Sequence, residues 1–333
     1  MGRFVRSASL TGYREVASAA GLDSHAMLAE FGLPAACLGQ TDLKLPVDAV
    51  RGLLEASAER TNLEGFALLM AEKRRLAHLG PVGLLLREQP TLRHALEALA
   101  RYANRMNNAM FLTLQHTSSV CLLRGELITG GEGPARQSTE LVAAVVFLSL
   151  REVLGEPWSP LRVFFAHAAP ADLTVHRRVF GDAVVFGQDL NGISWPRDRL
   201  DVPNRQADPI LARYARDLVN STFTDRGLMT DQVRELVLTQ LASGRTSIDA
   251  AAHQLGLSRR TMHRQLLREG HSFSGIVDDV RRELASRYLA DKHRTLAEIS
   301  ELLGFAAPSG FSRWHRRNFK DTASRKRVKR ARA

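Results

Sequence analysis

Apolar residues in the last third of the chain recur at three- and four-residue steps, and this pattern occurs twice, 48 residues apart. Such spacing places the apolar side chains on one face of a helix. The first set is Ile248, Ala251, Ala252 and Leu255, and the second is Leu296, Ile299, Leu302 and Leu303. Two amphipathic helices of the same design are therefore predicted.

Each of these helices has a start signal and a stop signal. Ser247 (or Thr246) and Thr295 precede the helices, and their side-chain oxygens can accept hydrogen bonds from first-turn N–H groups. Gly256 and Gly304 follow, and glycine adopts the left-handed backbone that ends a helix without a steric penalty. A second short helix comes after each glycine. The sequence therefore predicts two helix-turn-helix units, at about residues 246–268 and 295–319, joined by a long helix.

The second helix of each unit has an outward face that is polar or basic. In the first unit Met262 and Leu266 lie four residues apart, so they are predicted to face the core. An α-helix fits the major groove of B-DNA, where arginine can donate two hydrogen bonds to guanine. The residues predicted to read bases are Arg260, His263 and Arg264 in the first unit and Ser309, Ser312 and Arg313 in the second. The residues predicted to contact phosphates are Arg259, Arg268, Arg316 and Arg317. Because serine discriminates between bases less than arginine does, the first unit is expected to carry more specificity.

The excess positive charge of the 333-residue chain lies in the same region. Between Thr230 and Ala333 there are 21 Lys and Arg against 11 Asp and Glu, whereas the rest of the chain has 25 against 24. A single basic helix is often only a solvated surface. Two such helices in the one strongly basic region favour a polyanionic partner, and double-stranded DNA fits the predicted helices.

The first two thirds of the chain predict an α+β domain. Its first hundred residues have mostly helical periodicity, and alternation at residues 111–128, interrupted by polar residues 117–119, predicts a β-hairpin. Ser138 or Thr139 is expected to begin a long buried helix that ends near Leu154. The remaining predictions are a strand at 162–170, a short helix ending at Gly181, a second hairpin at 183–196 and a helix at 205–220. Residues 1–226 are predicted to form this α+β domain and residues 227–333 an all-α DNA-binding domain.

Cysteine usage and the apolar pattern indicate the cellular compartment. Cys37 and Cys121 lack metal-ligand or redox spacing, which favours a reducing compartment. The N-terminus lacks the apolar stretch of a signal peptide, and the longest apolar run, residues 141–150, is about half of what a membrane crossing needs. We therefore expect a cytoplasmic protein without membrane contact. His167 and His176 are candidates for lining an effector pocket, although scattered histidines are more often structural.

Chemical motifs give no sign of an enzyme. The sequence has no phosphate-binding glycine loop, no zinc-type ligand spacing and no nucleophile elbow. Neither a cofactor nor a metal is expected, and no catalytic residue is assigned.

The C-terminal hundred residues resemble the paired helix-turn-helix domain of the AraC/XylS family of bacterial transcription regulators. The resemblance is carried by LGLSRRTMHRQL, by VRRELASRYL and by AEISELLGF with SGFSRWHRR. It implies that the six residues above occupy base-reading positions, and that RNA polymerase is a partner. The N-terminal segments LGPVGLLLREQPTLRHALEALARY and VVFGQDLNGISWPRDRLDVP resemble the arabinose-binding-type regulatory domain of the same family. This second resemblance implies sensing of a small-molecule effector or formation of a homodimer.

The chain departs from the family pattern in two places. Trp314 and His315 stand where the family has a small residue followed by an apolar one, and the internal repeat places His315 opposite Leu266. The family's closing Gly-x-x-Pro turn and final aromatic residue are replaced by Lys320, Ala323 and Lys326. The tail is therefore expected to be a solvated basic arm that adds affinity for phosphates.

The functional prediction is a sequence-specific transcription regulator, an activator that responds to a small-molecule effector. The alternative is a basic architectural protein that coats nucleic acid without choosing a sequence. An enzyme fused to a DNA-binding module is a third reading, weakened by the missing catalytic motifs.

Overall fold

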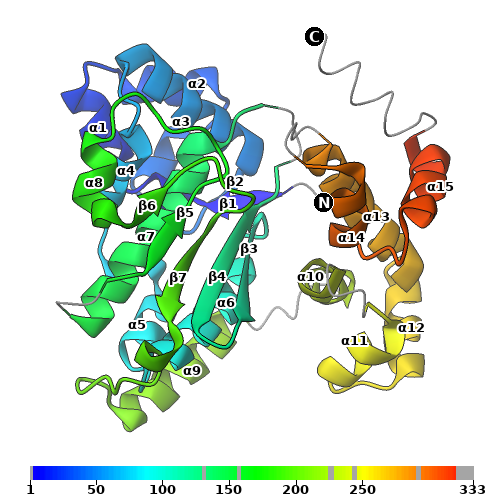
Figure 1. Ribbon diagram of the computed structural model, residues 1–333. Helices are drawn as coiled ribbons and strands as arrows, with labels where there is room; N and C mark the ends of the chain where they lie inside the picture. The colour runs from blue at the N-terminus through cyan, green and yellow to red at the C-terminus, as the bar shows by residue number, and fades with distance from the viewer. Residues whose placement is uncertain are drawn as a thin grey trace. The chain divides into compact units, whose positions relative to one another are not determined.

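An α+β unit and a helical unit, each with its own hydrophobic core, make up the chain (Figure 1). The computed structural model describes residues 3–129, 133–155, 159–223, 229–241, 246–289 and 294–319. The two compact units are Met1–Thr224 and Asp225–Ala333. The predicted fold class, an α+β domain followed by an all-α domain with helix-turn-helix units, is confirmed.

Short helices dominate the first hundred residues. They are α1 (Tyr13–Ala19), α2 (Ser24–Glu30), α3 (Val47–Thr61), α4 (Phe66–Glu72), α5 (Pro81–Arg87) and α6 (Leu92–Met106), with short 3-10 helices η1 (Ser7–Leu10), η2 (Ala35–Leu38) and η3 (Leu76–Leu79). Asp23 caps α2 by accepting hydrogen bonds from the N–H groups of His25 and Ala26. Two three-residue strands, β1 (Phe4–Arg6) and β2 (Lys44–Pro46), pair antiparallel. The sequence analysis did not predict them, because three residues are too short to show a period.

The main sheet lies in the second half of this unit. Its strands are β3 (Met110–His116), β4 (Val120–Leu127), β5 (Arg162–Phe164), β6 (Val184–Val185) and β7 (Gly192–Pro196). Within the described residues the order of the five strands is β3-β4-β7-β5-β6. The hairpin predicted at residues 111–128 is confirmed as β3 and β4, which pair antiparallel.

The hairpin predicted at residues 183–196 is wrong. β6 and β7 are not neighbours, because β5 lies between them, parallel to β6 and antiparallel to β7. The connection between them hydrogen-bonds to the segment that follows β5. Gly187 N–H donates to His167 O at 2.9 Å, Gln188 N–H donates to Phe165 O at 3.0 Å, and the Asn191 side chain accepts from Ala166 N–H at 2.9 Å. The local sequence resembles a hairpin, but this third segment separates its two arms.

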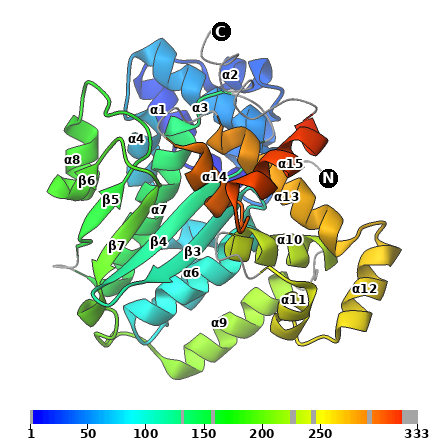
Figure 2. The same ribbon diagram turned by 45° about the vertical axis from the view of Figure 1, so that its right-hand side comes forward.

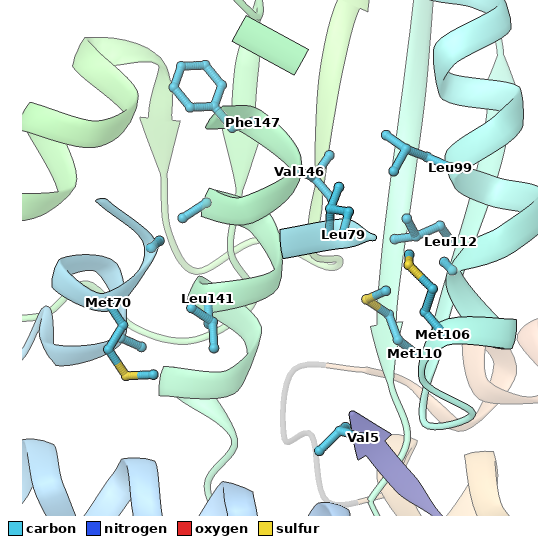
Figure 3. Close-up of a cluster of buried hydrophobic side chains, with 14 of the residues drawn as sticks. Val5, Met70, Leu79, Leu99, Met106, Met110, Leu112, Leu141, Val146 and Phe147 are labelled. Carbon is cyan, nitrogen blue, oxygen red and sulfur yellow. The ribbon is translucent and has the colours of Figure 1, made fainter. Parts of the chain in front are cut away.

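Helix α7 (Arg136–Leu154) packs against the sheet and begins two residues before the predicted Ser138. Cross-strand partners define the sheet face that enters the core. Leu123 lies opposite Ile193, and Cys121 opposite Trp195. All four side chains are buried. The unit is completed by α8 (Thr174–Phe180), α9 (Pro209–Thr222), η4 (Gly181–Ala183) and η5 (Arg197–Arg199). Figure 3 shows part of this core, with side chains from β3 and α7.

His167 and His176 lie against the buried carboxylate of Glu140 on α7. Their Nε2 atoms are 3.3 Å and 3.0 Å from the same Glu140 oxygen, and Glu140 and His176 are fully buried. Both imidazole rings also contact the ring of Phe186. Burial lowers the pKa of His167, although Ala168 O and Glu140 act in the opposite direction. This arrangement is that of histidines packed in the core, the structural reading considered above.

The helical unit has one continuous core. It contains α10 (Met229–Gln240), α11 (Ile248–Gln254), α12 (Arg259–Arg268), α13 (Phe273–Tyr288), α14 (Leu296–Leu302) and α15 (Pro308–Phe319). Buried side chains from all six helices form a single cluster. Figure 2 shows α13 running from the α11–α12 pair to the α14–α15 pair, as the long connecting helix was predicted to do.

The two turn glycines experience different constraints. Gly256 and Gly304 both have positive φ, +65° and +68°, which L side chains rarely adopt. A Cβ added at Gly304 would lie 2.3 Å from Leu241 O, whereas a Cβ at Gly256 would meet nothing within 4 Å. Gly304 is therefore fixed by close backbone approach as well as by conformation.

We expect Gly304→Ala to destabilise the helical unit more than Gly256→Ala. The left-handed backbone alone costs about 1–2 kcal/mol for alanine, and the overlap with Leu241 adds on the order of 1–3 kcal/mol. Urea unfolding of both variants, followed by far-ultraviolet circular dichroism, measures the difference. Equal destabilisation by the two variants would contradict the close contact at Gly304.

Candidate DNA-binding interface

The first helix-turn-helix unit is α11 followed by α12. Ser247 caps α11 by accepting from Ala250 N–H at 3.1 Å, as predicted. Ser258 caps α12 in the same way, accepting from Thr261 N–H at 3.1 Å. These caps fix where each helix begins, so they also fix which residues of α12 point outward.

Helix α12 has a buried face and a basic exposed face. Met262 and Leu266 are fully buried, which confirms their predicted position in the core. The exposed residues include all five predicted contacts in this unit, Arg259, Arg260, His263, Arg264 and Arg268. Arg260, His263 and Arg264 follow the three- and four-residue spacing of one helix face. The structure therefore groups the three proposed base readers on one accessible surface.

Leu267 belongs to the same exposed surface, with 58% of its surface accessible. The sequence analysis did not single it out, because a leucine in an amphipathic helix is normally assigned to the core. Its position seven residues after Arg260 would have placed it on the outer face. An apolar side chain there can contact the methyl group of thymine.

The second unit is α14 followed by α15. Thr295 and Glu298 form a capping box: Thr295 Oγ accepts from Glu298 N–H, and the Glu298 carboxylate accepts from Thr295 N–H. On α15 the inner face is formed by Phe311, Trp314 and His315, all buried. The predicted contacts Ser309, Ser312, Arg313, Arg316 and Arg317 are all exposed. The exposed surface of α15 therefore carries two hydroxyls where α12 carries arginine and histidine.

Trp314 ties α15 to the connecting helix. Its indole N–H donates to a carboxylate oxygen of Asp278 on α13 at 2.7 Å. The other Asp278 oxygen lies 3.7 Å from the Arg317 guanidinium, which is 73% exposed. Exposed ion pairs of this kind contribute little to stability, so Arg317 remains accessible to a phosphate.

Arg281 is basic but has a structural role. Its guanidinium lies over the Phe305 ring, 4.2 Å from the centroid, and donates to Leu303 O at 3.0 Å and to Gly304 O at 3.4 Å. Burial lowers its pKa, against the opposing effect of Asp278. Arg281 therefore satisfies the last carbonyls of α14 and holds the turn of the second unit.

His315 is fully buried, as its alignment with Leu266 indicated. Its ring stacks on Phe319, with centroids 4.5 Å apart and an angle of 19° between the planes. The Phe311 ring meets it edge-on at 5.6 Å. The imidazole thus takes the place of an aliphatic side chain within an aromatic cluster.

Glu269 caps the N-terminus of α10 from a position 40 residues further along the chain. One carboxylate oxygen accepts from Met229 N–H at 2.6 Å, and the other from the N–H and hydroxyl of Thr230, both at 2.7 Å. Burial acts to raise the pKa of Glu269, but the hydrogen bonds from Thr230 and Met229, together with nearby His271, outweigh it and lower the pKa. Helix α10, which packs against α11, α12 and α13, therefore depends on an ionised carboxylate.

The proposed basic tail, including Lys320, Ala323 and Lys326, lies outside the described part of the chain. Among the described residues, no group of histidine, cysteine, aspartate or glutamate is arranged to hold a metal ion. None of the described helices is long and apolar enough to cross a membrane.

Comparison with known proteins defines the class. Residues 21–204 match the family described as the arabinose-binding domain of AraC transcription regulator, N-terminal, and residues 228–329 match a helix-turn-helix domain. The HTH-type transcriptional regulator VirS of Mycobacterium tuberculosis (strain ATCC 25618 / H37Rv) is 31% identical over 323 residues, 96% of this chain and 95% of VirS. The ornithine utilization regulator of Pseudomonas aeruginosa is 33% identical over 169 residues, 50% of this chain and 49% of that protein.

Among solved structures, the transcriptional regulator CdpR from Pseudomonas aeruginosa aligns with 91% of this chain and 96% of its own, at 21% identity and a TM-score of 0.43. The sequence matches define a transcription regulator with a ligand-binding N-terminal domain and a helix-turn-helix DNA-binding domain. The chain belongs to the AraC/XylS family of transcription regulators. Its relatives are transcription regulators, so the architectural alternative is not supported.

We expect Glu269→Gln to lower the stability of the helical unit at neutral pH by about 1–2 kcal/mol, the usual range for losing a helix cap. Because the folded-state pKa of Glu269 is lowered, the carboxylate stabilises the fold above its ordinary pKa, and this contribution is lost as the pH falls through the folded-state pKa. Urea unfolding at pH 7 and in acid measures both effects.

The exposed Glu301→Gln on α14 is the matched control and should have little effect at either pH. A Glu269→Gln variant as stable as the wild type at pH 7 would show that the cap does not stabilise α10.

Proposed function

We propose that α12 and α15 are the recognition helices, and that Arg260, His263 and Arg264 read bases in one major-groove segment. Ser309, Ser312 and Arg313 read bases in the next segment, about one helical turn or roughly 34 Å away. The observation that carries this proposal is that the second helix of each unit has a buried face, with Met262 and Leu266 in α12 and Phe311 and Trp314 in α15, and exposes all of the named polar residues.

The two segments contribute unequally to specificity. Arginine can form a bidentate contact with guanine that discriminates by about 1–3 kcal/mol, whereas serine accepts several partners. Helix α12 exposes Arg260 and Arg264, and α15 exposes Arg313 together with two serines. The half of the operator read by α12 is therefore the more strictly defined half.

Contacts with phosphates set the overall affinity. Arg268, Arg316 and Arg317 are exposed on the same two helices. Arg259 is also exposed, with Asp249 3.5 Å away and both side chains 67% accessible. The basic residues after Phe319 add further sequence-independent attraction.

We expect Arg264→Ala to relax the preference for one base pair, with a loss of about 1–3 kcal/mol on the preferred operator and little change on a scrambled duplex. Arg268→Ala should weaken binding to both duplexes and reduce the dependence of affinity on salt by about one ion. Selection from random duplexes defines the operator, and fluorescence anisotropy at several salt concentrations measures both effects.

Arg177→Ala, which removes an exposed arginine from α8 of the other unit, is the matched control and should leave binding to both duplexes unchanged. Equal loss by Arg264→Ala on operator and scrambled DNA would remove Arg264 from the base-reading set.

The remaining parts of the proposal rest on family membership. Residues 1–226 are the regulatory domain and residues 227–333 the DNA-binding domain. Effector binding to the first changes DNA binding by the second, and the outcome is activation through RNA polymerase in the cytoplasm. The protein acts by binding and not by catalysis.

A homodimer is supported by the exposed side of α9. Ile210 and Tyr214 are 60% and 61% exposed, and Leu211 and Leu218 are also exposed. The opposite side of α9 packs on α5. Arg213 and Asp217 border this apolar surface, so an antiparallel second copy places opposite charges together. Self-complementary surfaces of this kind form two-fold dimers.

We expect Tyr214→Glu to shift the protein toward the monomer, because a carboxylate would be buried at the centre of the dimer contact. Sedimentation equilibrium over a range of concentrations measures the dissociation constant, which should rise at least about tenfold. Ser18→Glu, which adds the same charge to the exposed side of α1, is the control. An unchanged association constant in Tyr214→Glu would assign the dimer contact elsewhere.

A further inference from the structure

A pocket lies between α7 and the main sheet of the N-terminal unit. It contains about 420 Å³ of space, counting its open mouth. Its walls include Met110 and Leu112 from β3, Leu123 from β4, and Val142 and Val146 from α7. Figure 3 labels Met110 and Leu112 on the strand and Val146 on the helix. The walls are therefore mainly aliphatic.

The missing side chain of Gly125 leaves much of this space open. Gly125 lies opposite Leu112 in the β3–β4 ladder, on the sheet face that also carries Leu123. A Cβ added there would meet only Leu112 Cδ2, at an ordinary contact distance of 3.5 Å. By contrast, a Cβ at Gly192 would lie 2.7 Å from Leu123 O. The backbone requires glycine at 192, whereas at 125 its clearest effect is to leave room.

Among the few hydrogen-bonding groups of the pocket, two are neutral side chains, Asn191 and Thr139. Asn191 Oδ1 accepts from Ala166 N–H at 2.9 Å, so the amide is oriented with Nδ2 as the remaining donor. Neither Asn191 Nδ2 nor the Thr139 hydroxyl makes a hydrogen bond within the described part of the chain. Both residues line the pocket, one at the end of β7 and the other on α7. Each can donate a hydrogen bond to an acceptor atom of a ligand.

The pocket offers no free positive charge. Glu126 is the one charged residue among the described lining residues, and its carboxylate is paired with Arg124 at 2.7 Å. The side chains of this pair are 18% and 15% exposed. An anionic ligand would lose its hydration without gaining a cation. A pentose would bury several hydroxyls against aliphatic walls without partners.

We propose that this pocket binds a small uncharged molecule that has an apolar body and a single hydrogen-bond acceptor, such as a carbonyl group. The acceptor lies at Asn191 and Thr139, and the apolar body lies against β3, β4 and α7. This assignment rests on the proposed effector-sensing role of the N-terminal domain and specifies the chemical class of the effector.

The chemical class of the ligand is tested with four small molecules. Each is titrated into the full chain by isothermal titration calorimetry. Acetophenone has a ring and one carbonyl, ethylbenzene lacks the carbonyl, benzoate carries a charge, and L-arabinose is polyhydroxylated. Acetophenone should bind most tightly, with ethylbenzene about five- to tenfold weaker because it leaves the two donors without an acceptor. Benzoate should bind at least about tenfold more weakly than acetophenone. L-Arabinose should show no binding. Two results would each overturn the proposal. One is binding of benzoate or L-arabinose as tight as that of acetophenone, and the other is no binding of any of the four molecules.

The location is tested by Gly125→Val, which fills the pocket from the sheet. Valine suits a strand, so the unfolding temperature should stay the same or rise while affinity for acetophenone falls at least about tenfold. Thr113→Val adds a valine to the other face of the same sheet, and it should leave acetophenone binding unchanged. If Gly125→Val does not fold, Ala143→Leu fills the pocket from α7 instead. Undiminished binding in the folded filling variant would overturn the location.

The same proteins separate this proposal from the proposed function. Operator binding without ligand should be equal in the wild type and in Gly125→Val, because the recognition helices are unchanged. If the wild type does not bind DNA sequence-specifically, the proposed function is contradicted, whereas the calorimetric result is unaffected. Failure of the probes with intact operator binding would contradict only the pocket.

Discussion

One hydrophobic core holds α12 and α15, the two proposed recognition helices, and the rest of the DNA-binding unit depends on this shared core. Val280 of α13 is buried in the same cluster as Leu266 of the first unit and Phe311 of the second. Because α13 contributes to the packing of both, neither recognition helix can tilt without disturbing the other's support. The spacing of the two helices is thus a property of packing, and the proposed reading of two successive groove segments relies on this fixed separation.

The second unit achieves its packing by different means from the first. Aliphatic side chains fill the inner face of α12, whereas aromatic rings fill that of α15. Trp314 brings an indole N–H that needs a partner when it is buried, and Asp278 of α13 supplies one. Arg281 stabilises the aromatic cluster. Its guanidinium lies over the Phe305 ring and donates a hydrogen bond to a carbonyl at the end of α14. The chain departs from the family pattern at Trp314 and His315, and specific contacts support the side chains found there.

Local signals in the sequence predicted most of the elements, and contacts between distant segments account for the errors. Caps such as Asp23 and Thr295 act on residues two or three positions away, so a short stretch of sequence contains the whole interaction. The hairpin assigned to residues 183–196 failed because β5, from earlier in the chain, lies between its arms. Glu269 caps a helix 40 residues before it, a partnership that no local pattern contains. The outward residues of α12 were predictable since their spacing alone determines the face.

The pocket was the feature hardest to predict from the sequence, because it arises from an absent side chain. A glycine within a strand indicates a bulge or close approach as readily as an open space, and only the neighbours of Gly125 distinguish these cases. Its walls come from β3, β4, β7 and α7, which share one core. A ligand that contacts all four elements stabilises whichever arrangement of them it fits best. The ligand can change DNA binding only by as much as its own affinity differs between these arrangements. A ligand that binds two arrangements equally tightly therefore leaves transcription unchanged.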